Sequence, residues 1–99
     1  CWATEVGVDT IALMECLGER MKLYHINDRG TRMSGPGGQI LKSDSMELGY
    51  GNMNLTKMVD IAQKNGVDAV ILESHKNWVD KSTVKSFQLN AKFMNEYVV

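Results

Sequence analysis

The sequence predicts an α/β fold in the order helix, strand, helix, strand, helix, with its two strands parallel. Helical periodicity alternates along the chain with short apolar runs, and glycines end the first two helical segments. The second apolar run is apolar at nearly every position. Alternation of this kind is typical of parallel strands joined by crossover helices. A strand that is apolar on both faces needs a covering layer on each side of its sheet.

The composition is that of an ordinary globular protein: 99 residues, 43% hydrophobic and 23% charged. Eleven basic and twelve acidic residues give a formal net charge of −1. This balance lacks the basic surface that nucleic acids require, so we expect no nucleic-acid partner. No apolar run approaches the ~20 residues that span a bilayer, and no signal peptide opens the chain. We therefore expect a cytoplasmic protein with no membrane partner.

The first helix is predicted to begin at Asp9, a good N-cap, and to end at Gly18. Cys16 belongs to the apolar pattern of this helix, so we expect a buried free thiol there. Residues 21–26 follow and predict a strand, because apolar residues alternate loosely along them. One face of that strand carries Met21, Leu23 and His25.

Residues 27–51 are predicted to form a long polar connection, because they are rich in glycine and serine and show little periodicity. Connections longer than about 12–15 residues are usually functional loops or disordered segments. The Gly35–Gly38 stretch, which contains the only proline, is the expected source of specificity. Residues 48–51 read Leu-Gly-Tyr-Gly and lack the Lys-Ser/Thr of a phosphate loop, which favours a tight turn before the next helix.

The rest of the chain predicts a helix, a strand and a helix. The helix begins at the N-cap Asn54, carries one apolar face and ends at Gly66. Residues 69–74 are apolar until their last two positions, as in a strand buried on both faces. The final helix is predicted to start near Asp80 or Ser82. The stripe that we expect to face the core comprises Val84, Phe87, Ala91, Met94 and Val98.

Two candidate metal ligands, His25 and Glu73, lie near the C-terminal ends of the two predicted strands. Active sites of parallel α/β folds gather at that end of the sheet. An imidazole and a carboxylate that meet there can ligate a divalent metal. The competing interpretation is structural, because a lone histidine near a strand end is usually hydrogen-bonded within the fold and a lone glutamate there is usually solvated.

Further candidates flank these positions in the sequence. Asp28 and Arg29 follow His25 directly and can orient that histidine or contact a substrate, or else simply begin a solvated loop. Trp78 lies just beyond Glu73 and can form the wall of a sugar pocket, or else pack beneath the loop.

Four segments in order resemble the sugar phosphate isomerase/epimerase superfamily, the xylose-isomerase-like barrels. Trp2-Ala3 with Gly7-Val8-Asp9 resembles the segment after the sixth strand, and Tyr24-His25-Ile26-Asn27-Asp28 resembles the His-x-Lys-Asp end of the seventh. Residues 48–54, Leu-Gly-Tyr-Gly-Asn-Met-Asn, resemble the turn before the seventh helix. Residues 69–74 resemble the eighth strand, which ends in a metal-binding glutamate. The ordered match covers nearly the whole chain.

The resemblance implies that residues 1–99 are the C-terminal part of a (β/α)₈ TIM barrel, from helix six to helix eight, with the N-terminal part absent. The barrel's metal is held by Glu, Asp, His and Glu from successive strands. His25 matches the histidine and Glu73 the last glutamate, which places the other two ligands before Cys1. Asn27 stands where the family usually has lysine. We therefore expect either a homo-oligomer or a longer protein that supplies the missing part.

The implied reaction is proton transfer at a carbon next to a carbonyl of a sugar or sugar phosphate. A divalent metal (Mn, Mg, Co or Zn) acts as Lewis acid, and Glu73 serves as both ligand and catalytic base. His25 is a neutral ligand that Asp28 is expected to orient. Arg29 and Trp78 are the further candidates for substrate binding.

Three other functions remain open. An inosose dehydratase-like lyase of the same superfamily fits the same residues. An endonuclease IV-like DNA repair nuclease shares the His-x-Asn-Asp strand end, but Asp44-Ser45-Met46 puts methionine where the second metal-binding histidine is expected. A non-catalytic truncation product that oligomerises is the alternative if the 99 residues act alone, because half a site and open strand edges require partners.

Overall fold

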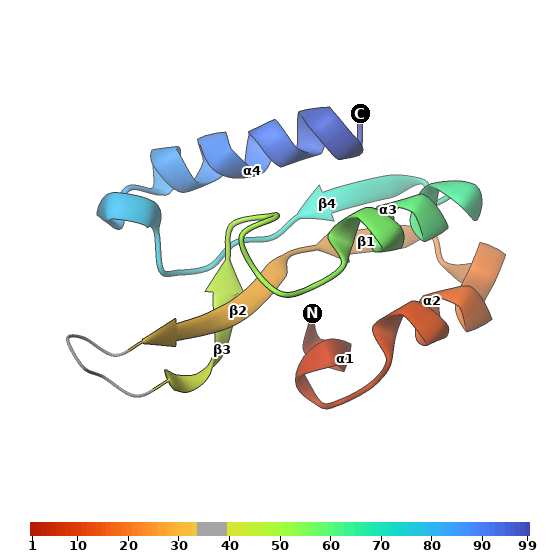
Figure 1. The fold of residues 1–99 in the computed structure, drawn as a ribbon. Coiled ribbons are helices and arrows are strands. Elements are labelled where there is room, and N and C mark those ends of the chain that lie inside the picture. The colour runs from red at the N-terminus through yellow and green to blue at the C-terminus, as the bar shows by residue number, and fades with distance from the viewer. Residues whose placement is uncertain (34–39) are drawn as a thin grey trace.

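The chain is a mixed α/β protein in the computed structural model, which describes residues 1–33 and 40–99 (Figure 1). The helices are α1 (Trp2–Glu5), α2 (Thr10–Leu17), α3 (Leu55–Lys64) and α4 (Thr83–Tyr97), with short 3₁₀ turns at Gly18–Arg20 and Val79–Lys81. The strands are β1 (Leu23–Ile26), β2 (Asp28–Met33), β3 (Ile40–Met46) and β4 (Ala69–Leu72). The predicted order is present as α2, β1, α3, β4 and α4.

The helix starts follow local capping chemistry, as the sequence predicted. The Asp9 carboxylate accepts a hydrogen bond from the Ala12 N–H at 3.1 Å, which satisfies one unpaired donor at the start of α2. Asn54 caps α3 in the same way, and Ser82 caps α4. None of the helices in the described part of the chain is long and apolar enough to cross a bilayer.

The strands β1 and β4 pair in parallel, as predicted, with His25 opposite Ile71. Hydrogen bonds extend the ladder at both ends, because the Asp68 N–H donates to the Lys22 carbonyl and the Glu73 N–H donates to the Ile26 carbonyl. The connection between the two strands contains the β2–β3 pair and then α3, so the unit is a β–α–β crossover with an inserted strand pair. The C-terminal ends of both strands therefore lie at the same edge.

The core lies on one face of this strand pair. Ile26 is fully buried there together with the apolar face of α3, and Tyr24, Val70 and Leu72 pack against the same cluster. The opposite face is open: Leu23 is 60% exposed and Ile71 45% exposed. The structure thus covers only one side of β4, whose sequence predicted burial on both sides.

The expectation of a long irregular connection over residues 27–51 was wrong, because β2 and β3 form an antiparallel hairpin in which Arg29 pairs with Ser45. Figure 1 shows β2 continuing outward from β1 and β3 returning toward the loop that precedes α3. A two-stranded ribbon of this kind needs no apolar face, so it leaves no alternating pattern in the sequence. The Gly35–Gly38 stretch, expected to set specificity, lies outside the described residues.

The prediction for the inward face of α4 was wrong in part: Met94 and Val98 pack against the core as expected, but Ala91 is exposed. Val84 and Phe87, expected in the core, are 67% and 40% exposed, whereas Ser86 and Asn90 are buried. Two hydrogen bonds to the segment after β3 explain this orientation: the Ser86 hydroxyl bonds to the Glu47 carboxylate at 2.9 Å, and the Leu48 N–H donates to Asn90 at 2.7 Å. Buried polar contacts, which a hydrophobic pattern cannot reveal, orient α4.

Cys16 is a smaller correction, because this thiol was expected to be buried and is exposed. Met14 is the buried residue of α2, which contacts α3. A single neighbouring helix covers only part of the circumference of α2, so a residue two positions from the buried one faces solvent.

Candidate active site

Glu73 stands directly after β4, where its backbone is still fixed by the sheet. Its N–H donates to the Ile26 carbonyl at 3.0 Å, so the residue keeps the register of the strand pair. Its side chain is 22% exposed, which leaves the carboxylate accessible at the C-terminal edge. This is the edge at which ligands bind in open α/β sheets.

The structure brings together the two side chains that the sequence singled out as metal ligands. The His25 Nδ1 atom lies 3.5 Å from the Glu73 Oε2 atom. The two residues come from paired parallel strands and lie on the same face of the sheet, the face without a covering layer. They therefore meet at one rim, as the strand pattern predicted.

Two further side chains contact the Glu73 carboxylate, and sequence reasoning did not select either. The Asn27 amide donates from Nδ2 to Oε2 at 3.1 Å, and the His75 Nε2 atom lies 2.9 Å from Oε1. Each carboxylate oxygen thus has a nitrogen partner from a side chain. Their positions, two residues from His25 and Glu73 at the same strand ends, were the available signal.

Asp28 is the first residue of β2 and lies close to the end of β1, but its side chain does not contact Glu73. Its carboxylate accepts the backbone N–H groups of Arg29, Gly49, Gly51 and Met53, at distances from 2.8 to 3.3 Å. The residue anchors the turn before α3, because these four hydrogen bonds go to that turn and to its own strand, and none of them goes to His25. Burial, and then the negative charge of Asp28, raises the pKa of the nearby Tyr24 phenol.

Arg29 joins the hairpin to the start of the chain. Its Nε atom lies 2.8 Å from Glu5 Oε2, and its guanidinium group lies 5.7 Å from the centre of the Trp2 ring. The arginine side chain is largely buried by these contacts. Trp78, for which the sequence left both a sugar-pocket wall and packing beneath the loop open, lies against Phe87 of α4, with ring centres 6.2 Å apart.

A cavity of about 340 Å³ lies beside two side chains that contact Glu73, although neither Glu73 nor His25 lines it. These two side chains, Asn27 and His75, form part of the cavity wall. The side chains of Arg29 and Trp2 also line it, which places the first helix beside the predicted site. The remaining lining residues are Cys1, Glu5, Asp44, Ser45 and Lys76.

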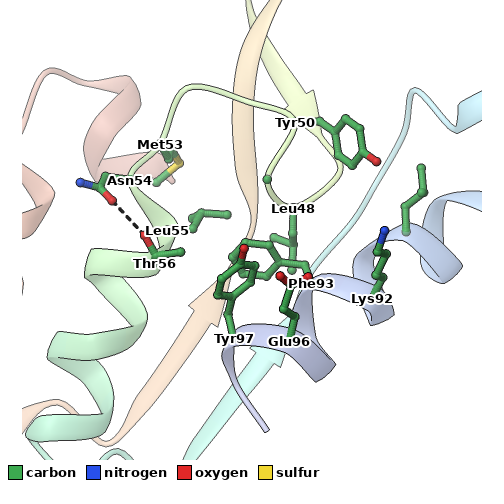
Figure 2. A pocket seen from close by; sticks show the side chains of 12 residues that line it. Leu48, Tyr50, Met53, Asn54, Leu55, Thr56, Lys92, Phe93, Glu96 and Tyr97 are labelled. Atoms are coloured by element: carbon green, nitrogen blue, oxygen red, sulfur yellow. Dashed lines mark hydrogen bonds between the residues drawn. The ribbon is translucent and has the colours of Figure 1, made fainter.

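A second cavity of about 380 Å³ lies between α4 and the turn that precedes α3. Figure 2 shows Phe93, Glu96 and Tyr97 of α4 facing Leu48 and Leu55 across it. Its lining contains neither His25 nor Glu73. This cavity belongs to the helix-covered side of the molecule, away from the strand ends where the predicted ligands meet.

His25 and Glu73 fit part of a divalent-metal site. The 3.5 Å between His25 and Glu73 allows one ion with bonds of about 2.0–2.2 Å to contact both atoms. Within residues 1–33 and 40–99, however, no group of three or more histidine, cysteine, aspartate or glutamate side chains is arranged around one point. The described residues thus supply a pair of ligands, and a complete coordination shell requires others.

Comparison with known proteins gave no match to any family model, to any curated protein or to any solved structure.

Proposed function

We propose that this chain is the C-terminal part of a divalent-metal-dependent sugar or sugar-phosphate isomerase or epimerase with a xylose-isomerase-like (β/α)₈ barrel. The observation that supports this most directly is the 3.5 Å separation of His25 Nδ1 and Glu73 Oε2 at the ends of paired parallel strands. These are the two positions that match the family's last two metal ligands.

The open face of the strand pair supports the barrel. Leu23 and Ile71 are apolar, largely exposed and on the same face as His25. Parallel sheets are almost always covered on both faces, because their strands carry apolar residues on both. In a closed barrel these side chains would lie in the interior, beneath the metal site, once further strands covered them. The rest of the protein or further copies of the chain would supply those strands.

The chemistry follows from what the three side chains around Glu73 can do. A bound divalent cation supplies Lewis acidity to a substrate carbonyl, with His25 and Glu73 among its ligands. Glu73 takes a proton from the carbon next to that carbonyl and returns it to the neighbouring carbon or to the opposite face. Asn27 donates to Oε2 and fixes the orientation of the carboxylate. His75, beside Oε1, is placed to receive or return a proton.

Exchange with solvent deuterium tests this reaction without knowledge of the exact sugar. The protein in its full natural length is incubated in D₂O with Mn²⁺ and a panel of ketoses, and NMR follows deuterium at the carbons next to the carbonyl. We expect exchange with at least one ketose, and Glu73→Gln should lower its rate by about 10²-fold or more, the contribution of a general base. Glu19→Gln, which removes an exposed carboxylate elsewhere, is the matched control.

Three results would overturn the proposal. Exchange that survives Glu73→Gln would remove Glu73 as the base. Exchange that does not depend on the divalent ion would remove the metal. A product lighter than the substrate by one water would assign the protein to the dehydratase alternative, which uses the same residues.

A further inference from the structure

The cavity beside Glu73 carries information about the substrate that the metal ligands do not. On the basis of the proposed function, we infer that this cavity binds the hydroxyl groups of an uncharged polyhydroxylated compound, a free sugar or polyol, in preference to a phosphate ester. The inference rests on the charges of the lining and on one unsatisfied acceptor.

Each permanently cationic side chain of the cavity has an anionic partner. Arg29 pairs with Glu5 at 2.8 Å, and Lys76 pairs with Asp44 at 3.4 Å. Although partial burial opposes ionisation, hydrogen bonds from Ser45, Asn77 and Lys76 lower the pKa of Asp44, so this carboxylate is ionised at neutral pH. A phosphate ester would have to displace one of these carboxylates before it could bind either cation.

The glycine-rich turn before α3 lies outside the lining of this cavity and already holds an anion of the protein itself. Successive backbone N–H groups in a glycine-rich turn form a concave anion site, and residues 48–53 make such a turn. The N–H groups of Gly49, Gly51 and Met53 all donate to the Asp28 carboxylate. The anion that this turn selects is therefore a side chain of the same protein.

The uncharged side chains of the cavity lining are suited to binding the hydroxyl groups and C–H face of a sugar. Asn27 is 8% exposed, and its Oδ1 atom is buried without a hydrogen-bond partner, while its Nδ2 atom is committed to Glu73. An unsatisfied buried acceptor costs about 1–3 kcal/mol, and a sugar hydroxyl that reached Oδ1 after a small rotation of the Asn27 side chain would offset this cost. Trp2, which also lines the cavity, presents an exposed ring, an apolar surface against which the C–H face of a sugar can lie.

The test is a binding measurement made without metal, so that it does not depend on turnover. The ¹⁵N-labelled chain is titrated with D-fructose and, separately, with D-fructose 6-phosphate. We expect D-fructose to shift the Trp2 indole and Asn27 side-chain amide signals, with a dissociation constant at least about tenfold below that of the phosphate. The Trp78 indole, which packs on α4 away from the cavity, is the internal control and should not move.

A charge variant tests the reason for the preference. Glu5→Gln combined with Asp44→Asn leaves Arg29 and Lys76 without their carboxylate partners, and we expect the preference to shift by about tenfold or more toward the phosphate. Asp60→Asn on α3, outside the cavity, removes a similar charge and should leave the preference unchanged. Circular dichroism of each variant checks that the fold is retained.

The outcomes separate this inference from the proposed function. Tighter binding of the phosphate by the unmodified chain, or shifts that include Trp78 equally, would overturn the inference alone. Sugar binding at Trp2 and Asn27 by a protein that shows no metal-dependent deuterium exchange would retain the cavity and overturn the proposed reaction. Failure of the double variant to change the preference would remove the paired charges as its cause.

Discussion

Asp28 and Glu73 are two carboxylates at neighbouring strand ends with opposite surroundings. Asp28 is 1% exposed, and four backbone N–H groups donate to it. The Glu73 side chain is 22% exposed, and its partners are the side chains of His25, Asn27 and His75. One carboxylate is fixed by the main chain, and the other is surrounded by groups that can rotate away.

This difference separates structure from function at the same edge of the sheet. Backbone donors cannot leave without breaking the turn, so the Asp28 carboxylate is unavailable to a metal or a substrate. Side-chain donors can exchange their partner for an ion or a ligand at little cost to the fold. The accessible carboxylate is the one on which we base the proposed chemistry.

The largest effect is expected when the fixed carboxylate is replaced. Asp28→Asn removes the charge and turns one acceptor into a donor that faces backbone N–H groups, so we expect a loss of about 3 kcal/mol in the free energy of unfolding. Glu73→Gln is the matched substitution at the accessible site and should change it by less than about 1 kcal/mol. Urea denaturation of both variants measures the difference, and equal losses would contradict the division of roles.

A smaller effect is expected from the turn that Asp28 holds. At Gly51 an added Cβ would collide with the Arg29 carbonyl oxygen and the Asp28 carboxylate. Gly51→Ala should therefore cost about 2 kcal/mol, as overpacking against fixed atoms does. Gly66→Ala is a useful comparison, because nothing lies near its Cβ and only its positive φ opposes the change. Thermal unfolding should show the larger loss at Gly51, and the reverse order would contradict the close approach.

The smallest effect concerns pH. The folded-state pKa of Asp44 is lowered from its ordinary value of 3.8, so its contribution to stability is present above that value and is lost as pH falls through the lower folded pKa. The difference in melting temperature between the native chain and Asp44→Asn should be constant at neutral pH and vanish in strong acid. A difference in melting temperature that grew on acidification would contradict the lowered pKa of Asp44.

Much of the fold was predictable because its signals are local. Capping by Asp9 and Asn54 depends on residues within one helical turn, and the parallel strands follow from apolar runs separated by a helix. The meeting of His25 and Glu73 followed from strand direction alone. These predictions required no knowledge of distant contacts.

The features that the sequence did not predict depend on contacts between residues far apart along the chain. The role of Asp28 became clear only when the turn at Gly49 was placed against it, 21 residues along the chain. The contact of Arg29 with Trp2 joins the hairpin to the first helix, and no spacing in the sequence indicates it. The orientation of α4 was mispredicted in part for the same reason, because Ser86 is buried through its bond to Glu47.

The central claim is that His25 and Glu73 together hold one divalent cation. Titration of the ¹⁵N-labelled chain with Mn²⁺ tests it directly, because the paramagnetic ion broadens amide signals close to where it binds. We predict that the amide signals of His25 and Glu73 broaden first and that Glu73→Gln abolishes this localised broadening. Broadening that centres on other carboxylates such as Asp9, or that persists unchanged in Glu73→Gln, would contradict the account.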